Sequence, residues 1–324
     1  MHTYVADDGR VRRIDEGDDT VSEAQSYGLL ISVAVGDQER FDAIWAWTRA
    51  NLQRTDGLLA WHWKDGTVID HEPAADADVL TAYALAAASR RFQRPDLDRD
   101  ATELAAAVLT HETLTTPTGP VLLSPWAKHT RTINPSYLAP FVFDALAETT
   151  GDSTWEAAAT TARDLLTTLV TPPTSLIPDW ATLRSDGAAL SPAPSPTGQN
   201  PEIGLDAWRT PVFLAADCDS QGRHLAAQAW TFLRHQDPLT AVYHLDGKPA
   251  VTWSHPAALV GAAATAHAAG DVAASADMLA AARDLNRQDP TYYGSAWLAL
   301  GSLLLDTDRL GGCATDNSPQ PANA

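Results

Sequence analysis

The chain has 324 residues, of which 45% are hydrophobic and 19% are charged, a composition typical of a globular protein with a sizeable core. Its formal net charge of −19 argues against a nucleic-acid-binding surface or an anionic-membrane-binding surface. No apolar run approaches the roughly 18 residues that cross a bilayer, and the first residues, MHTYVADDGRVRR, lack the apolar core of a signal peptide.

Helical periodicity recurs along the whole chain. It predicts about eleven helices, at residues 23–35, 38–53, 76–93, 98–111, 136–150, 153–170, 207–217, 220–235, 256–269, 272–287 and 291–305. Gly-Asp pairs separate several neighbours, as in VGDQERF and TGDSTW, which indicates tight helical hairpins. DADVLTAYALAAAS is apolar nearly all round, whereas the next helix, DLDRDATELAAAVL, has one charged face. Inner and outer helices therefore alternate, which predicts an all-α fold, an α/α toroid whose twelfth helix is short or supplied by the N-terminus.

Short strand-like pieces lie between the helices. In DGLLAWHWKDG, Leu59, Trp61 and Trp63 fall on one face by alternation, and GPVLLSP is similar, so we expect β-hairpins in the loops. The Pro- and Ser-rich residues 171–201 are typical of a functional or mobile loop. No shift in composition marks a boundary, so we predict one domain over residues 1–310 and a disordered tail over residues 311–324.

Carboxylates open three of the predicted inner helices. Ser22 is a predicted N-cap and Gln25 completes a capping box, which puts Glu23 at the first helical position, near the positive end of the helix dipole. Asp76 opens a second helix and Asp206 a third. Because the inner helices of a toroid run parallel, their N-termini meet at one end, and we expect the three acids to gather there.

Each of these acids taken alone is more typical of an ordinary helix start. Their company favours chemistry, because glycosidic bond hydrolysis needs two carboxyl groups in different protonation states. A helix dipole lowers the pKa of a carboxyl, so a proton donor at Glu23 needs an opposing effect. Exclusion of water and a second carboxylate would supply it, and Asp76 is the candidate neighbour.

Several segments, in order, resemble one known family. VSEAQSYGLLISVAVGDQERFDAIWAWTRANL followed by DGLLAWHW, then AADADVLTAYAL, INPSYLAPFVFDALAE, LIPDW and GLDAWRTP, are similar to glycoside hydrolase family 8, bacterial endoglucanases on an (α/α)6 barrel. The resemblance covers residues 18–305 and is closest to the cellulases that accompany bacterial cellulose synthases. It implies a single catalytic domain with the fold of an (α/α)6 toroid.

The resemblance also implies roles for individual residues. The family's general acid falls on Glu23, its general base on Asp206, and the aspartate that holds the sugar at the cleavage point on Asp76. Family members invert the anomeric configuration, so a water must fit between acid and base. We therefore expect their carboxyl groups to stand roughly 6.5–9.5 Å apart.

Three residues depart from the family pattern. Ala24 replaces the usual glycine after the acid, Ala75 replaces the Ser or Thr before the sugar-binding aspartate, and Leu205 stands where a tyrosine often precedes the base. That tyrosine helps orient the base and its water. Its loss leaves a second hypothesis open, a non-catalytic glycan-binding protein on an enzyme fold.

Aromatic residues are abundant, with eleven tryptophans, and Trp or Tyr stack on the apolar faces of sugar rings. The substrate-binding candidates, each with core packing as its alternative, are Tyr27, Trp61, Trp63, Trp126, Tyr137 and Trp180, and the resemblance adds Arg209. The histidines show no metal-ligand spacing and no phosphate-binding loop is present, so we expect neither a metal nor a cofactor.

These observations together predict an inverting, endo-acting glycoside hydrolase for β-1,4-glucan chains. Chitosan and xylan are the alternative substrates, and the net charge of −19 suits cationic chitosan. The expected partner is a polysaccharide or oligosaccharide, with no nucleic acid and no membrane insertion, and we expect a monomer. The family resemblance implies a secreted or cell-envelope protein.

Overall fold

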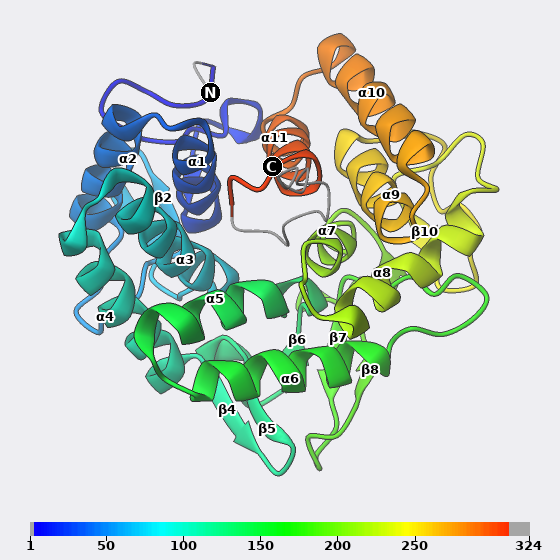
Figure 1. Cartoon of the computed structure of the whole chain (residues 1–324), viewed down its shortest axis with the longest axis horizontal. Helices are drawn as coiled ribbons and strands as arrows, with labels where there is room; N and C mark the ends of the chain where they lie inside the picture. Colours follow the sequence, from blue (N-terminus) through cyan, green and yellow to red (C-terminus); the bar gives the residue numbers. More distant parts are fainter. Residues whose placement is uncertain (1–2, 311–324) are drawn as a thin grey trace, which may run out of the picture.

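The computed structural model of the chain describes residues 3–310, so the predicted tail at residues 311–324 lies outside the described residues. Over this part of the chain the helices form a ring of hairpins (Figure 1). They are α1 (Ser22–Val35), α2 (Gln38–Asn51), α3 (Ala75–Phe92), α4 (Pro95–His111), α5 (Pro140–Thr150), α6 (Thr154–Thr167), α7 (Arg209–Ala215), α8 (Ser220–Leu233), α9 (Pro256–Ala268), α10 (Val272–Gln288) and α11 (Tyr292–Asp306). The odd-numbered helices each contact the next, and α11 contacts α1, which closes an inner ring.

Burial explains why the inner and outer helices differ in sequence. Every residue of α9 from Pro256 to Ala266 is buried, because this inner helix is surrounded on all sides. The outer helix α4 buries one stripe, with residues spaced three or four apart. That stripe consists of Leu97, Ala101, Leu104, Ala105 and Val108. The predicted toroid of helical hairpins is confirmed.

Within residues 3–310 there is no twelfth α-helix, and the N-terminal segment, with one 3-10 turn at Ile14–Glu16, joins the two ends of the ring. The rings of Tyr4 and Tyr292 meet edge to face, with centroids 5.6 Å apart. The Asp15 carboxylate accepts hydrogen bonds from the Tyr292 N–H, at 3.0 and 3.1 Å, at the start of α11. In Figure 1 the segment crosses from α1 and α2 toward α11.

The capping box predicted for Ser22 and Gln25 is wrong. Val21 occupies the N-cap position and no side chain caps α1. The Gln25 side chain is fully buried, accepts a hydrogen bond from the Val11 N–H at 2.6 Å and donates one to the Thr48 hydroxyl at 2.7 Å. The side-chain amide of Gln25 thus bonds to the N-terminal segment and to α2, and it does not cap the start of α1.

Short antiparallel strands lie in the segments that precede the inner helices. They form a sheet of β1 (Thr20–Val21), β2 (His62–Lys64) and β3 (Thr67–Asp70), a hairpin of β4 (Thr113–Thr116) and β5 (Gly119–Leu122), a sheet of β6 (Thr132–Ile133), β7 (Ala181–Leu183) and β8 (Leu190–Pro192), and a pair of β9 (Glu202–Ile203) and β10 (Tyr243–His244). These strands therefore surround the end of the ring at which the inner helices begin.

The predicted helix over residues 136–150 begins later than expected. Residues 135–137 form a separate 3-10 turn, and α5 starts only at Pro140. A residue that precedes proline avoids the helical conformation, and Ala139 has φ −107° and ψ 84°. The break leaves Tyr137 in the connection that leads into an inner helix.

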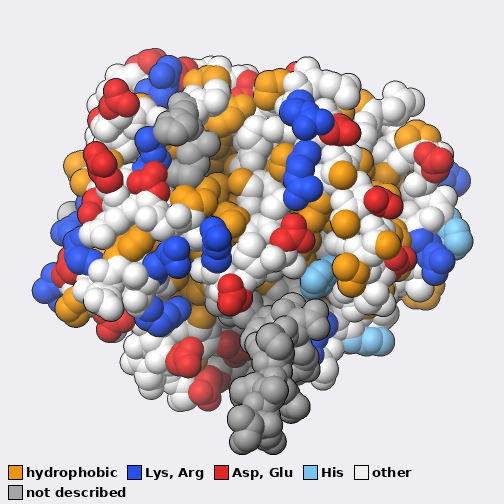
Figure 2. All heavy atoms as spheres, turned by 45° about the horizontal axis from the view of Figure 1, so that its top comes forward, with side chains coloured by type: hydrophobic (Ala, Val, Ile, Leu, Met, Phe, Trp, Pro, Cys, Tyr) orange, Lys and Arg blue, Asp and Glu red, His pale blue; other side chains and the backbone are white. Residues whose placement is uncertain are grey.

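The surface of the ring carries mixed charge. On the face shown in Figure 2, basic side chains are scattered among acidic ones rather than gathered into one patch. Within residues 3–310, no helix is both long enough and apolar enough to cross a membrane.

The contact between α9 and the segment before α7 gives a stability prediction. A Cβ atom added at Gly261 would lie 2.8 Å from the Trp208 ring and 2.9 Å from the Trp208 carbonyl oxygen. Alanine is a better helix former than glycine, yet overpacking a core costs about 1–3 kcal/mol. We expect Gly261→Ala to lower the free energy of unfolding by about that amount in denaturant titrations. Ala281→Ser, at an exposed position of α10, is the control, and equal stability of the two variants would contradict the close packing.

Candidate active site

One buried arginine joins two of the three predicted acids. Arg209 begins α7, is 5% exposed, and places Nη1 3.2 Å from Asp76 Oδ2 and Nη2 3.2 Å from Asp206 Oδ1. Its Nη1 also lies 3.4 Å from the Tyr27 hydroxyl of α1. Side chains that are far apart in the sequence therefore meet where α1, α3 and α7 begin.

Glu23 lies in the first turn of α1 and is partly buried. Burial raises its pKa, and the negative charge of Asp206 acts in the same direction, whereas Arg209 and Arg13 oppose it. The Ser22 hydroxyl is 3.4 Å from its Oε2 atom. The proton of Glu23 is therefore held to a higher pH than on an ordinary glutamate.

Asp76 lies in the first turn of α3 and is 5% exposed. Burial raises the pKa of Asp76 to about 8, the charge of Glu23 adds to this rise, and Arg209 opposes it. Its Oδ2 faces Arg209, while its Oδ1 has no hydrogen-bond partner among residues 3–310.

The sequence predicted that Asp206 opens a helix, and this is wrong. Asp206 lies in the turn between β9 and α7. Its side chain is 37% exposed, more than that of Asp76. Its Oδ2 accepts a hydrogen bond from the Asn134 side chain at 3.0 Å, while Arg209 holds its Oδ1. The turn position and these two partners orient the carboxylate toward solvent-accessible space.

Asp179 supports the turn that carries Asp206. Its Oδ1 accepts a hydrogen bond from the Ala207 N–H at 2.6 Å. A Cβ atom added at Gly204 would clash with its Oδ2, so a larger residue there would displace the Asp179 carboxyl. Burial raises the pKa of Asp179 to about 7, and the charge of Asp206 adds to this rise. Asn134 and Asp179 belong to the segments INPSYLAPFVFDALAE and LIPDW, but nothing in the sequence alone marks either residue for a role.

Four of the predicted aromatic residues line one cavity with Glu23. Its volume is about 540 Å³, and its wall includes Trp61, Trp126, Tyr137 and Trp180. The rings of Trp126 and Trp180 are tilted toward each other, with centroids 6.3 Å apart. Part of the long Pro- and Ser-rich segment, from Ser195 to Gln199, forms another side of the cavity.

The other two aromatic candidates lie outside the wall of this cavity. Tyr27 is 3% exposed and packs behind Arg209, edge to face on Trp297 at 5.4 Å. Trp63 packs on Trp47 at 5.2 Å and beneath the Arg10 guanidinium. An irregularity in the pairing of β2 with β3, between His62 and Trp63, breaks the alternation that predicted one common face for Trp61 and Trp63.

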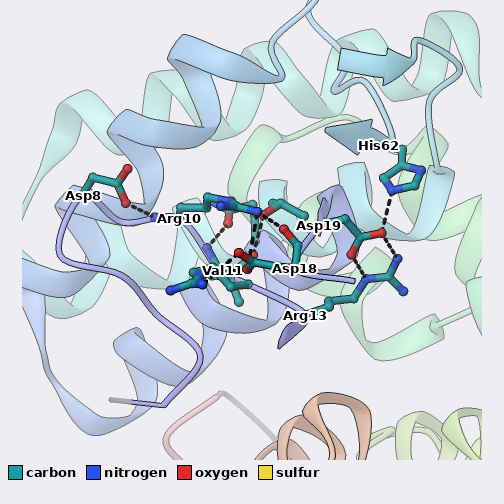
Figure 3. A network of polar contacts seen from close by, with 10 residues as sticks. Asp8, Arg10, Val11, Arg13, Asp18, Asp19 and His62 are labelled. Atoms are coloured by element: carbon teal, nitrogen blue, oxygen red, sulfur yellow. Dashed lines mark hydrogen bonds and ion pairs between the residues drawn. The ribbon is translucent and has the colours of Figure 1, made fainter. Parts of the chain in front are cut away.

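A charged network anchors β2 to the N-terminal segment (Figure 3). The buried Asp19 carboxylate accepts hydrogen bonds from Arg13 at 2.7 and 2.8 Å and lies 2.6 Å from His62 Nε2. Burial alone would raise the pKa of Asp19, but these partners hold it below the ordinary value. The His62 ring packs on Trp61 with centroids 4.8 Å apart, so the network fixes one wall of the cavity.

The three departures from the family pattern have distinct surroundings. The Leu205 carbonyl accepts a hydrogen bond from the Tyr293 hydroxyl of α11 at 3.1 Å, so a tyrosine from elsewhere contacts the residue beside Asp206. The Ala75 N–H donates to the Ser124 hydroxyl at 3.2 Å. Ala24 lines a small apolar cavity beneath the N-terminal segment rather than the large one.

Comparison with known proteins gives concordant matches. A family model described as "Glycosyl hydrolases family 8" matches residues 1–307. A probable endoglucanase of Novacetimonas hansenii is 34% identical over 222 residues, which cover 65% of this chain and 63% of that protein. The Paenibacillus barcinonensis reducing-end xylose-releasing exo-oligoxylanase Rex8A is 29% identical over 66% of this chain and 60% of that protein. The matched part thus spans less than two thirds of either relative.

A solved structure matches over nearly the whole chain. The endo-beta-1,4-glucanase CMCax of Acetobacter xylinum superposes with a TM-score of 0.78 and 27% identity, covering 94% of this chain and 94% of that one. The match agrees with the ring of helices described above, and the family resemblance predicted from sequence segments is confirmed.

The raised pKa of Asp179 gives a pH-dependent stability prediction. The folded state holds this proton up to about pH 7, whereas an unfolded aspartate releases it near pH 4, so stability is lost as the pH rises through the folded pKa. Asparagine cannot ionise. We expect the unfolding free energy of Asp179→Asn, relative to that of the parent protein, to increase between pH 4 and pH 8 by up to about 4 kcal/mol.

Urea titrations at a series of pH values would measure this difference. Glu148→Gln removes an exposed carboxylate of α5 and serves as the control, with a difference that stays constant over the same range. A constant difference for Asp179→Asn as well would show that the Asp179 carboxyl ionises alike in both states.

Proposed function

The chain belongs to glycosyl hydrolase family 8, and from that premise we propose that it hydrolyses β-1,4-glucan chains by an inverting, endo-acting reaction. The observation that carries the proposal is the position of Glu23. This glutamate lines a cavity of about 540 Å³ with tryptophan walls, and the charges of Asp206 and Arg209 both act on its carboxyl. Such a constellation suits a sugar chain with a proton donor beside it.

In this proposal Glu23 is the general acid. It protonates the oxygen of the leaving sugar as the glycosidic bond breaks, which requires a carboxyl that is still protonated when the base is ionised. Burial raises the pKa of Glu23 and so extends the pH range in which it can donate. The Arg209 guanidinium limits this rise.

Asp206 is the general base in the same proposal. As a carboxylate it takes a proton from the water that attacks the anomeric carbon from the opposite face of the sugar ring. The bonds from Arg209 and Asn134 support this role because they leave the carboxylate oriented and accessible. The attack from the opposite face inverts the anomeric configuration.

Asp76 binds the sugar at the cleavage point. The bond from Arg209 to its Oδ2 supports this role, since it fixes the carboxyl at the start of α3, and Oδ1 is left without a partner among residues 3–310. Trp61, Trp126 and Trp180 offer flat faces on which neighbouring sugar rings can stack. β-1,4-Glucan is the preferred substrate because the relatives from Novacetimonas and Acetobacter are named as endoglucanases.

Chitosan is the second candidate substrate, on the strength of one observation. Asp70 and Glu72 both line the cavity, and their carboxylates suit the ammonium groups of a glucosamine polymer. Xylan is a third, since the relative Rex8A is named as an oligoxylanase. The three polymers can be compared directly in one assay.

The test is reducing-end release from soluble β-1,4-glucan, chitosan and xylan by the parent protein and by Glu23→Gln. We expect release from the glucan, and a fall of about 10²- to 10⁴-fold in the variant, because glutamine cannot donate the proton. The anomeric form of the first product, followed by NMR, would distinguish inversion from retention.

The control for this test is Glu148→Gln, which should keep full activity, and thermal unfolding would establish that both variants are folded. Equal release of reducing ends by Glu23→Gln and by the parent protein would show that Glu23 is not the general acid. Binding of glucan without release of reducing ends would favour the alternative of a non-catalytic glycan-binding protein.

A further inference from the structure

Two tryptophans are clearly exposed among those that the structure describes. Trp126 is 38% exposed and lines the cavity beside Glu23, whereas Trp253 is 48% exposed and lies outside it. A large aromatic side chain buries about 150–250 Å² when it is covered, so an exposed tryptophan offers a wide flat face to a ligand.

Trp253 lies at the active-site end of the ring. It belongs to the connection between β10 and α9, and α9 begins at the end where the other inner helices begin. Figure 1 places β10 and β2 on opposite sides of the ring. The connection that contains Trp253 therefore enters the ring on the side away from β2.

A row of rings leads from the Asp206 turn to Trp253. The Tyr293 hydroxyl contacts the Leu205 carbonyl beside Asp206, at 3.1 Å. The Tyr293 ring lies 6.0 Å from the His255 ring, and the His255 ring lies 6.4 Å from Trp253. This aromatic row continues the site outward on the side of Asp206.

The backbone beneath Trp253 is fixed to the same segment as Asp206. The Trp253 carbonyl accepts a hydrogen bond from the Ala241 N–H at 2.9 Å. The Ala241 carbonyl in turn accepts one from the indole N–H of Trp208 at 2.8 Å. Trp208 directly precedes Arg209 in the chain. The exposed ring is therefore held in a defined place relative to the acids, which limits the entropy lost when it binds a ligand.

His255 adds a polar group to the row. Its Nδ1 accepts a hydrogen bond from the Ala257 N–H at 3.1 Å, and burial lowers its pKa to about 4. The neutral ring then carries its proton on Nε2. That Nε2–H makes no hydrogen bond with another group in residues 3–310, so it is free to donate to a hydroxyl group beside the Trp253 ring.

We propose that Trp253 is a stacking platform for a pyranose ring of the glycan chain, beyond the Asp206 turn and on the side of the ring away from β2 and Trp61. The inference rests on the proposed function for the identity of the ligand. The cleft then extends from the cavity beside Glu23 past the Asp206 turn to Trp253. Long chains gain this contact, and chains too short to reach Trp253 do not.

The experiment measures binding of cellohexaose and cellobiose by calorimetry in the background of Glu23→Gln, with and without Trp253→Ala. We expect the dissociation constant for the hexaose to rise by about 3- to 10-fold, because one aromatic stacking contact is lost, and that for the disaccharide to stay the same. Trp253→Phe keeps an aromatic face and should retain most of the hexaose affinity. Leu245→Ala, at an exposed position in the same connection, is the matched control and should bind as the parent does.

Binding and hydrolysis answer separate questions here. Equal hexaose dissociation constants with and without Trp253→Ala overturn the platform, and so does a hexaose that binds to neither protein, whatever the activity of the parent protein. A length-dependent loss restored by phenylalanine supports it, even if the parent releases no reducing ends. Reducing-end release by the parent protein decides the proposed function separately. Thermal unfolding confirms that each variant is folded.

Discussion

The buried guanidinium of Arg209 is the interaction on which the arrangement of the site depends. A cation taken out of water is costly unless partners compensate for its lost hydration. Here Asp76 of α3, Asp206 of the turn before α7 and the Tyr27 hydroxyl of α1 supply that compensation, and the Tyr137 ring lies 5.7 Å from the guanidinium carbon. The starts of three inner helices are thus constrained to one relative position, and the cavity beside Glu23 acquires a defined shape.

Carboxyl groups outnumber cations around this arginine, and burial decides how the excess is accommodated. Behind Asp76, the side chains of Asp78 and Glu112 are fully buried. Burial raises the pKa of Asp78 well above its ordinary value and that of Glu112 to about 8. The negative charge of Asp76 adds to both rises. Asp78 Oδ1 accepts a hydrogen bond from the Leu59 N–H at 2.9 Å. This buried carboxyl therefore supports the segment that leads to Trp61.

Where a local motif lacks a polar side chain, residues from distant parts of the chain contact the backbone at that position. Tyr293 of α11 reaches the backbone beside Asp206, where the sequence has Leu205, and the Ser124 hydroxyl meets the backbone at Ala75. A closed ring makes such contacts possible, because every connection that enters an inner helix ends at the same face. A departure at one position of a motif is therefore a weak argument about activity until the opposite side of the ring is known.

The sequence by itself determined the ring of helices and identified three acids at the end of the ring where the inner helices begin. Alternation of fully apolar and one-sided helices is a local property, and Glu23, Asp76 and Asp206 are marked by their positions near helix starts. Asn134, Asp179 and Trp253 could not be found in this way, since their significance lies in contacts with residues far away in the chain. Trp61 and Trp63 were separated by one irregularity of strand pairing that no alternation pattern records. Periodicity expresses which face of an element is buried, whereas only the folded ring decides which side chains meet across its end.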